Sequence, residues 1–200
     1  MDYAPTDRSG RHLGSDSLRA AKVVVVGPLG VGKTTLVGSV SEIAPLRTEE
    51  TMTRAGEVLD DLASAQGKDT TTVAMDFGRM TLSEDIVLYL FGAPGQPRFR
   101  QMLEGLLEGA LGGVIMADTR RLEDSFPSMD RLEEAGVPYA VAVNHFDGAP
   151  EYSEAELRDA LDLHEHTPLQ VCDARNRASV KAVLIALIAH LMSRPSMELA

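Results

Sequence analysis

The first clear apolar run of the chain covers residues 22–26 and reads Lys-Val-Val-Val-Val. It is short, β-branched and followed by Gly27, which is typical of a parallel strand buried on both faces. A helical pattern follows over residues 33–43. Ahead of the strand, residues 1–19 mix Pro, Gly, Ser, Asp and Arg without periodicity, so we expect a flexible arm there.

Strand and helix patterns alternate along the rest of the chain. Residues 45–71 are polar and show no clear pattern beyond a helical stretch at 55–62. The predicted strands are 73–80, 86–91, 113–117, 139–143 and 169–172, and the predicted helices are 126–135, 154–163 and a last one with Val180, Val183, Leu184, Leu187, Ile188 and Leu191 on one face. The strands at 73–80 and 86–91 are close enough in sequence to pair antiparallel.

This order of elements predicts an α/β fold. We expect a doubly wound, mostly parallel six-stranded sheet with one antiparallel edge strand and helices on both faces. The predicted domain spans residues 20–193, with a tail over 194–200. Ligands of such sheets bind at the carboxyl ends of the strands.

Composition limits where the chain works. Hydrophobic residues make up 44% of its 200 residues, and no run of about 18 apolar residues is present that could span a bilayer. The start has neither a signal-peptide core nor a Gly for myristoylation, and the end has no prenylatable Cys. We expect a cytoplasmic protein that reaches membranes only through partners and does not insert directly.

Charge and cysteine content exclude other classes. The net charge of −11 opposes general binding to nucleic acid, because that binding depends on Lys and Arg meeting phosphates. The single Cys172 can form neither an internal disulfide nor a zinc site by itself.

A phosphate-binding motif follows the first strand. Residues 27–34 read Gly-Pro-Leu-Gly-Val-Gly-Lys-Thr, which matches G-x-x-x-x-G-K-[ST] between a strand and a helix. A loop that merely joined these elements would not need a Lys and a Thr at its end. Lys33 would bind the β- and γ-phosphates, Thr34 would bind Mg²⁺, and the helix N-terminus would add positive charge. The predicted nucleotide contacts here are Gly27, Gly30, Val31, Gly32, Lys33, Thr34 and Thr35.

A second motif concerns the base. Asn144-His145-Phe146-Asp147 resembles the N-K-x-D element by which the Ras-like GTPase superfamily reads guanine. A carboxylate such as Asp147 accepts two hydrogen bonds from guanine N1–H and its 2-amino group, and adenine offers no such pair of donors. The resemblance implies that Asn144 ties this loop to the P-loop. His145 stands where the family has a Lys whose stem covers the base.

One strand later, Cys172-Asp173-Ala174-Arg175 lies where the superfamily has its S-A-K loop. The resemblance implies that Cys172, Ala174 and Arg175 lie against the nucleotide and that the Ala174 N–H binds guanine O6. Cys172 also fits a small core residue at the end of its strand.

Two segments resemble the switches, the loops that order around the γ-phosphate. Residues 72–77 are similar to the T-I-G-V-D-F of Rab-type GTPases, which nominates Thr72 as a Mg²⁺ ligand, with Thr70 and Thr71 as rivals.

Residues 95–100 resemble the G-Q-E-R-F-R of switch II. Gly95 would donate its N–H to the γ-phosphate, and Gln96 would orient the attacking water. The family's usual Mg²⁺-holding Asp is replaced by Gly92. Asp118, which follows a later strand, either substitutes for this Mg²⁺-holding Asp or is a turn residue at the end of its strand.

The missing Asp, the Ala-Pro-Gly-Gln of switch II and the Met-Asp-Phe strand resemble bacterial MglA-like GTPases, and most closely the actinobacterial conservon-type GTPases. The resemblance covers about residues 20–193. It implies GTP/GDP and Mg²⁺ as cofactors, a signalling role, a Roadblock/LC7-type partner and a sensor-kinase-like membrane complex.

The resemblance implies slow hydrolysis. An arginine finger can add roughly 10³ to 10⁵ in rate; Arg98 and Arg100 are candidates, or they face solvent or a partner. Leu29 occupies a P-loop position that is Gly in efficiently stimulated Ras-like enzymes, so its side chain would crowd an incoming finger and Gln96.

Two other functions remain open from the sequence. One is a P-loop ATPase or small-molecule kinase, with Asp118 as its Mg²⁺ ligand. The other is a nucleotide-binding adaptor with little or no hydrolysis, because Gly92, Leu29 and His145 each depart from the family pattern. His164 and His166 read as exposed loop residues rather than metal ligands, because no further ligand cluster is evident.

Overall fold

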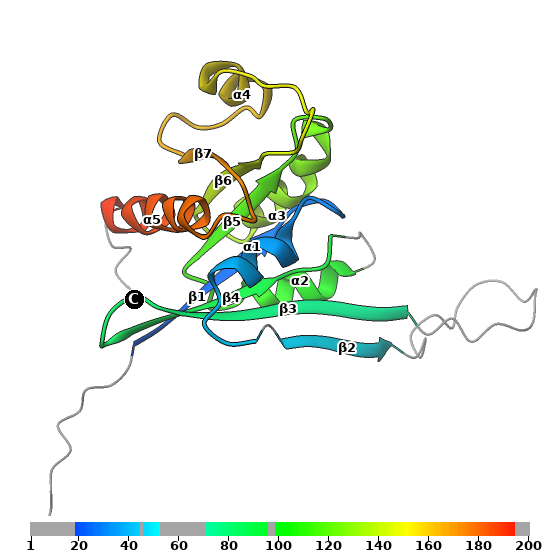
Figure 1. Cartoon of the computed structure of the whole chain (residues 1–200), viewed down its shortest axis with the longest axis vertical. Coiled ribbons are helices and arrows are strands. Elements are labelled where there is room, and N and C mark those ends of the chain that lie inside the picture. Colours follow the sequence, from blue (N-terminus) through cyan, green and yellow to red (C-terminus); the bar gives the residue numbers. More distant parts are fainter. Residues whose placement is uncertain (1–18, 45, 53–70, 96–98, 195–200) are drawn as a thin grey trace, which may run out of the picture.

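The computed structural model describes residues 19–44, 46–52, 71–95 and 99–194, with the backbone alone for 46–52, 71–74 and Arg100. The strands are β1 (Arg19–Val26), β2 (Leu46–Met52), β3 (Thr71–Thr81), β4 (Ile86–Gly92), β5 (Gly112–Ala117), β6 (Tyr139–Asn144) and β7 (Leu169–Cys172). The helices are α1 (Lys33–Val40), α2 (Arg100–Leu107), the 3₁₀ turn η2 (Leu122–Ser125), α3 (Phe126–Glu134), α4 (Glu154–Ala160) and α5 (Arg177–Ser193). Figure 1 shows the strands as one twisted sheet with helices on both sides.

The sheet order is β2-β3-β4-β1-β5-β6-β7. Strands β4, β1, β5, β6 and β7 pair in parallel, and β3 is antiparallel to both of its neighbours. The predicted doubly wound, mostly parallel α/β fold is confirmed. β2 adds a seventh strand that the polar pattern of its region does not reveal, so the antiparallel strand lies one place in from the edge rather than at it.

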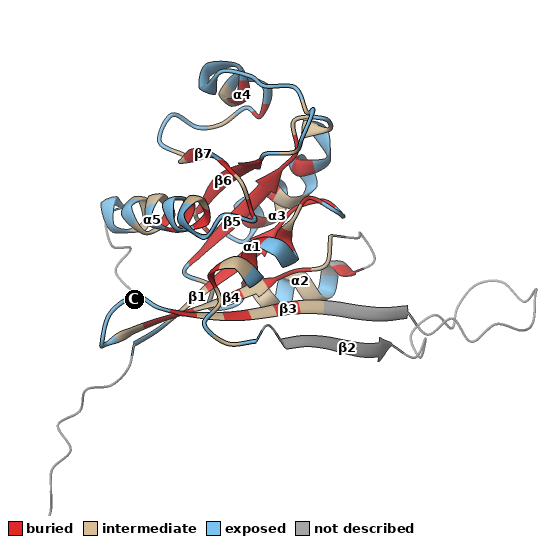
Figure 2. Ribbon diagram, in the orientation of Figure 1, coloured by how far each residue is buried: buried red, intermediate tan, exposed pale blue. Residues whose placement is uncertain are grey.

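Alternation along β1 divides the core between the two faces of the sheet. Val23 and Val25 belong to the apolar cluster under α1 and α5, while Val24 and Val26 belong to the cluster under α2, α3 and α4. All four are buried, which is why the run reads as continuously apolar. Figure 2 shows the buried strands between helices whose outer faces are exposed.

The last helix confirms its predicted apolar face. Val180, Val183, Leu184 and Leu187 of α5 are buried, and Leu191 packs against the same cluster. Other helices end earlier than their patterns suggest: α1 stops at Val40 and α4 at Ala160. The helical stretch at 55–62 lies outside the described residues. No helix in the described part of the chain is long and apolar enough to cross a membrane.

Candidate functional site

The loop between β1 and α1 has the backbone of a phosphate cradle. Gly27, Gly30 and Gly32 have φ angles of 139°, 77° and 106°, a region that side chains rarely adopt. A Cβ on Gly27 would lie 2.5 Å from the Met116 carbonyl oxygen, and one on Gly32 would lie 2.7 Å from Asn144 Nδ2. Glycine is therefore required at both ends of the loop.

Lys33 is folded back onto this loop. Its Nζ donates hydrogen bonds to the carbonyl oxygens of Gly27, at 2.8 Å, and Pro28, at 2.7 Å. Burial lowers the pKa of Lys33 to about 8, while Asp76 opposes this shift and Arg121 adds to it. The ammonium group thus lies inside the loop, where phosphate oxygens can replace the two carbonyls.

Asp76 is the residue of this site that the sequence did not nominate. Thr34 Oγ1 donates a hydrogen bond to Asp76 Oδ2 at 2.5 Å, and Asp76 is buried. In the antiparallel pair of β3 and β4, Asp76 lies directly opposite Gly92. A Cβ on Gly92 would lie 3.0 Å from the Asp76 Cβ and 3.2 Å from its Oδ2. A carboxylate thus stands on the neighbouring strand, opposite the position where the family pattern has one, and a side chain at position 92 would be crowded against it.

The pair of Thr34 and Asp76 fits Mg²⁺. A hydroxyl and a carboxylate are hard oxygen donors, and Mg²⁺ in nucleotide sites is held by one or two carboxylates together with phosphates and waters. Among the residues that the structure describes, no cluster of three or more His, Cys, Asp or Glu side chains could hold a metal by itself. Thr72 lies in β3, where only its backbone is described.

A cavity of about 350 Å³ opens beside these residues. Its lining consists of Leu29, Gly30, Gly32, Lys33, Thr34, Thr35, Asp76, Ala93, Pro94, Gly95 and Phe99. A Cβ on Gly95 would lie 2.6 Å from the Gly27 carbonyl oxygen and 2.8 Å from Lys33 Nζ. Gly95, which begins the segment that resembles switch II, therefore lies against the P-loop, while Gln96 and Arg98 lie outside the described residues.

Asn144 joins the P-loop to the two loops that follow β6 and β7. Its Nδ2 donates to the Val31 carbonyl at 3.0 Å, and its Oδ1 accepts from the Ala174 N–H at 2.9 Å. The His145 N–H also donates to the Cys172 carbonyl at 2.7 Å. The Ala174 N–H, which the resemblance assigns to guanine O6, thus already has an acceptor in this structure.

Asp147 lies at the open end of this arrangement. Its side chain is 86% exposed, and its Oδ1 is 3.9 Å from both His145 Nε2 and Arg175 Nη2. Arg175 forms its closer pair with Asp173, at 2.9 Å. The Asp147 carboxylate is therefore accessible to a ligand and is flanked by two nitrogen-bearing side chains.

Asp118 closes the turn after β5 and takes no part in the phosphate cavity. It is fully buried and accepts hydrogen bonds from Arg120 Nε at 2.9 Å and Arg120 Nη2 at 2.6 Å. These bonds hold the pKa of Asp118 below its usual range. The Arg120 guanidinium in turn lies 4.0 Å from the centre of the Phe146 ring, a cation–π contact with the base-side loop.

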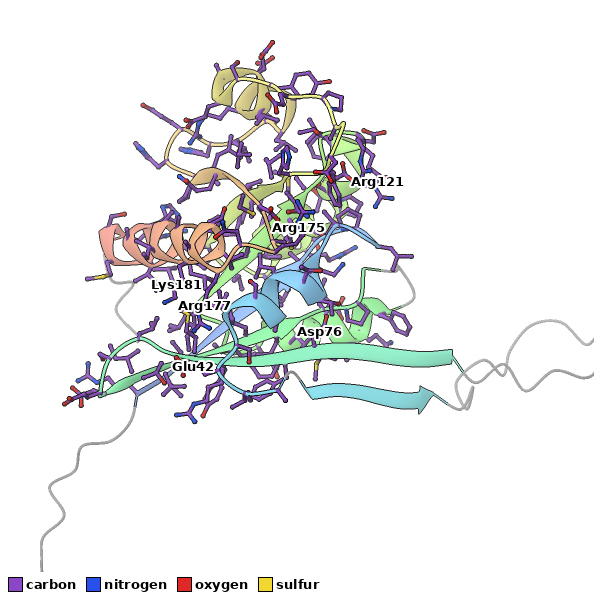
Figure 3. All side chains as sticks on the ribbon, in the orientation of Figure 1. Glu42, Asp76, Arg121, Arg175, Arg177 and Lys181 are labelled. Atoms are coloured by element: carbon purple, nitrogen blue, oxygen red, sulfur yellow. The ribbon has the colours of Figure 1, made fainter. Side chains whose placement is uncertain are left out.

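Figure 3 shows Asp76 and Arg121 on either side of the P-loop and Arg175 near the start of α5. The predicted site residues whose side chains or loops the structure describes thus gather at the carboxyl ends of β1, β4, β6 and β7. They form two groups, which we name by their predicted roles: a phosphate side, around Lys33 and Thr34, and a base side, around Asn144 and Asp147. This position at the strand ends is where doubly wound sheets bind nucleotides.

Solved structures share this architecture. The cytosolic domain of the T. maritima FeoB iron transporter in its apo form superposes with a TM-score of 0.62 at 16% identity, over 88% of this chain and 66% of that one. GDP form I of the same domain gives a TM-score of 0.63 at 17% identity, over 88% of this chain and 65% of that one. The chain thus has a P-loop GTPase-like fold and spans just under two thirds of those structures.

Sequence comparison adds a curated relative and a family. An elongation factor G-like protein of Synechocystis sp. is 29% identical over 157 residues, which are 78% of this chain and 23% of that protein. Residues 25–194 match the sequence model of the family described as "conserved hypothetical ATP binding protein". That match includes the P-loop, the two segments that resemble switches and the loops after β6 and β7, and so covers most of the chain. The chain therefore belongs to this family of nucleotide-binding proteins.

Proposed function

We propose that this chain is a GTP-binding switch that hydrolyses GTP to GDP slowly. The observation that carries the proposal is the Asn144 bridge, which joins the P-loop at Val31 to the loop at Ala174. On this proposal the site extends from Lys33, past the bridge, to the exposed Asp147 carboxylate. A guanine at the Asp147 end would place the phosphates of its nucleotide at the Lys33 end.

The phosphate end supplies charge and position, which is most of what phosphoryl transfer needs from a protein. Lys33 would exchange its two carbonyl acceptors for phosphate oxygens. Thr34 and Asp76 would hold Mg²⁺, which neutralises charge on the phosphates when bound. Gly95 would donate its N–H to the γ-phosphate, and Gln96 would orient the attacking water.

The expectation of slow GTP hydrolysis involves Leu29, at the open side of the P-loop. Leu29 is 61% exposed there and lines the phosphate cavity. Its side chain occupies space that a partner's arginine would need in order to reach the γ-phosphate. Hydrolysis without an arginine finger is slow in this class of enzyme, and Leu29 would hinder a finger from a partner, so we expect a low rate.

The wider role rests on sequence resemblance alone. The likeness to MglA-like, conservon-type GTPases leads us to propose signalling with a Roadblock/LC7-type protein and a sensor-kinase-like membrane complex. On this proposal the chain is cytoplasmic and is brought to the membrane by those partners.

A second candidate comes from the family, whose description names ATP. On this alternative the chain is a P-loop ATPase, and Asp147 has no role in choosing the base. An adaptor that binds nucleotide without hydrolysis is the third.

One titration separates the three functions. Purified protein in Mg²⁺ is titrated with fluorescent GTP, GDP and ATP, and phosphate release is then followed. We expect tighter binding of GTP than ATP, followed by slow release of phosphate. Tighter binding of ATP would establish the ATPase alternative, and binding without release would establish the adaptor.

The variant Asp147→Ala tests the role of the exposed carboxylate in the same titration. Loss of hydrogen bonds to a charged group should weaken GTP binding roughly 10- to 100-fold and leave ATP binding unchanged. Glu151→Ala, which removes an exposed carboxylate outside the site, serves as the control. Equal weakening of GTP and ATP binding by Asp147→Ala would contradict guanine recognition at this residue.

A further inference from the structure

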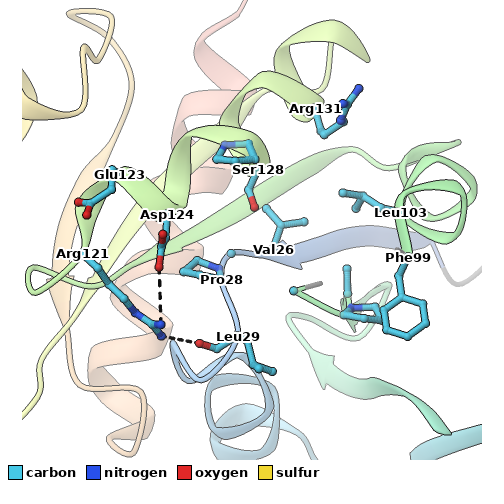
Figure 4. A pocket seen from close by; sticks show the side chains of 15 residues that line it. Val26, Pro28, Leu29, Phe99, Leu103, Arg121, Glu123, Asp124, Ser128 and Arg131 are labelled. Carbon is cyan, nitrogen blue, oxygen red and sulfur yellow. Dashed lines mark hydrogen bonds and ion pairs between the residues drawn. The ribbon is translucent and has the colours of Figure 1, made fainter. Parts of the chain in front are cut away.

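Arg121 reaches the P-loop from the turn that follows β5. The Arg121 N–H donates to the Asp118 carbonyl at 3.0 Å, which closes the turn. Because β5 pairs with β1, this turn lies beside the loop that leaves the end of β1. Arg121 Nη2 donates a hydrogen bond to the Leu29 carbonyl oxygen, as Figure 4 shows.

Two carboxylates hold the Arg121 guanidinium in this position. Its Nε lies 3.6 Å from Asp118 Oδ2, and its Nη1 lies 3.6 Å from Asp124 Oδ2. These two contacts are ion pairs, because their N···O distances are too long for hydrogen bonds. Among the described residues, the Leu29 carbonyl thus accepts the hydrogen bond of the Arg121 guanidinium, which has five N–H donors in all.

The positive charge of Arg121 lies close to the P-loop. A Cβ on Gly30 would lie 3.6 Å from Arg121 Nη2, so the guanidinium lies against the middle of the P-loop. Lys33 Nζ lies on the other side of the same loop, against the carbonyl oxygens of Gly27 and Pro28. A polyphosphate bound in this loop would therefore meet two cations, Lys33 and Arg121.

Arg121 remains accessible to a ligand. Its side chain is 39% exposed, and it lines a second cavity of about 620 Å³ between the P-loop, Phe99 and α3. Figure 4 shows Arg121 and Arg131 both lining this cavity, with Arg121 at the P-loop and Arg131 on α3.

We infer that Arg121 is a built-in cation of the nucleotide site, which stabilises the extra negative charge of a bound nucleoside triphosphate relative to the diphosphate. This inference rests on the proposed function, which supplies the hydrolysis of a nucleoside triphosphate. Because Arg121 would act on the phosphates, the inference holds for either guanine or adenine. Leu29 hinders a partner's arginine from reaching the phosphates. Arg121 would supply part of that positive charge from within the chain.

The test compares Arg121→Gln and Arg121→Lys with the control Arg131→Gln in the full chain. Arg131 lines the same cavity but pairs with Glu134 on its own helix, at 2.5 Å, so the control removes the same charge without touching the P-loop. Affinities for a non-hydrolysable triphosphate and for the diphosphate are measured together with the single-turnover rate. Thermal unfolding of each variant checks that it is folded.

We expect Arg121→Gln to lower the ratio of triphosphate to diphosphate affinity, and the single-turnover rate, by roughly 10- to 100-fold. Arg121→Lys should keep most of the affinity ratio, and Arg131→Gln should behave as the wild type. Equal loss of both affinities in Arg121→Gln, or no loss, would overturn the inference and leave Arg121 as a support for the P-loop.

The outcomes separate this inference from the proposed function. If the wild type prefers ATP, the proposed base specificity fails, and the ATP to ADP ratio then tests Arg121. If the wild type binds no nucleotide, both are wrong.

Discussion

At the scale of single residues, Cys172 shows how burial sets chemistry. The thiol is 2% exposed and lies in the apolar cluster under α1 and α5. Burial, with a smaller contribution from Asp173, raises the pKa of Cys172 to about 12. A thiol held neutral in this way is a weak nucleophile. The sequence left open a core residue or a nucleotide neighbour, and the burial favours the core.

This pKa predicts how stability depends on pH. Between about pH 8.5, where a free thiol ionises, and pH 12, the folded chain keeps Cys172 protonated while the unfolded chain does not. The contribution of Cys172 to the free energy of unfolding is thus fully present below about pH 8.5 and declines as pH rises. Relative to Cys172→Ala, the wild type should lose about 1 to 2 kcal/mol between pH 7 and pH 10. Denaturant unfolding of both proteins at the two pH values measures this, and a constant difference would contradict it.

At the scale of elements, the register of β3 and β4 determines where the Mg²⁺-side carboxylate stands. Asp76 and Gly92 lie at equal distances from the turn that joins the two strands, as do Phe77 and Phe91. The sequence predicted both strands, and counting back from the turn would have paired position 76 with 92. The prediction missed Asp76 because it sought the carboxylate along one strand instead of across two.

Because Asp76 and Gly92 lie opposite each other, we predict that the two residues can be exchanged between the strands. Gly92→Asp alone should destabilise the fold, because its Cβ meets the Asp76 side chain at 3.0 Å and brings a second carboxylate. Asp76→Gly alone should raise the Mg²⁺ concentration needed for tight triphosphate binding by roughly tenfold or more. The double variant Asp76→Gly/Gly92→Asp should recover much of both losses, as measured by thermal unfolding and by Mg²⁺ titration.

One outcome would contradict the predicted exchange of Asp76 and Gly92. If the double variant is as poor as the sum of the single variants, the two positions act independently and a carboxylate at position 92 does not replace Asp76. An unchanged Mg²⁺ requirement in Asp76→Gly would show that Asp76 serves the fold and not the metal.

The predictability of the other elements varied with their burial. β1 and α5 were predicted well because their apolar residues are buried, those of β1 on both faces of the sheet and those of α5 on one face of the helix. β2 was missed because Leu46–Met52 carries a polar sequence at the sheet edge, where backbone pairing with β3 makes the strand without an apolar pattern.

At the scale of the whole molecule, Asn144 ties together three loops that are far apart in sequence. It is 5% exposed and bonds both the Val31 carbonyl and the Ala174 N–H. Asn144→Ala would leave two buried polar groups without partners, each at about 1 to 3 kcal/mol. We expect the free energy of unfolding without nucleotide to fall by roughly 2 to 4 kcal/mol.

His145→Ala is the control for Asn144→Ala in denaturant unfolding. The His145 side chain is 45% exposed, so its removal should change stability by about 0.5 kcal/mol or less. If Asn144→Ala were as stable as this control, the bridge would contribute nothing to the fold.

The candidate site was only partly readable from the sequence, for a physical reason. The P-loop and the Asn144 motif are contiguous, so local spacing reveals them. Asp76, in the middle of β3, and Arg121, in the turn after β5, meet the P-loop only after the sheet has formed. The hydrogen bond between the Ala174 N–H and Asn144 also depends on how the loops pack.

The turn after β5 holds two arginines that are adjacent in sequence. Arg120 lies over Phe146 in the base-side loop, and Arg121 bonds Leu29 in the P-loop. One peptide unit therefore connects the loop after β6 with the P-loop. On the proposed function, a molecule that displaced this turn would weaken the contacts with base and phosphates together, so that a single movement would promote release of the nucleotide.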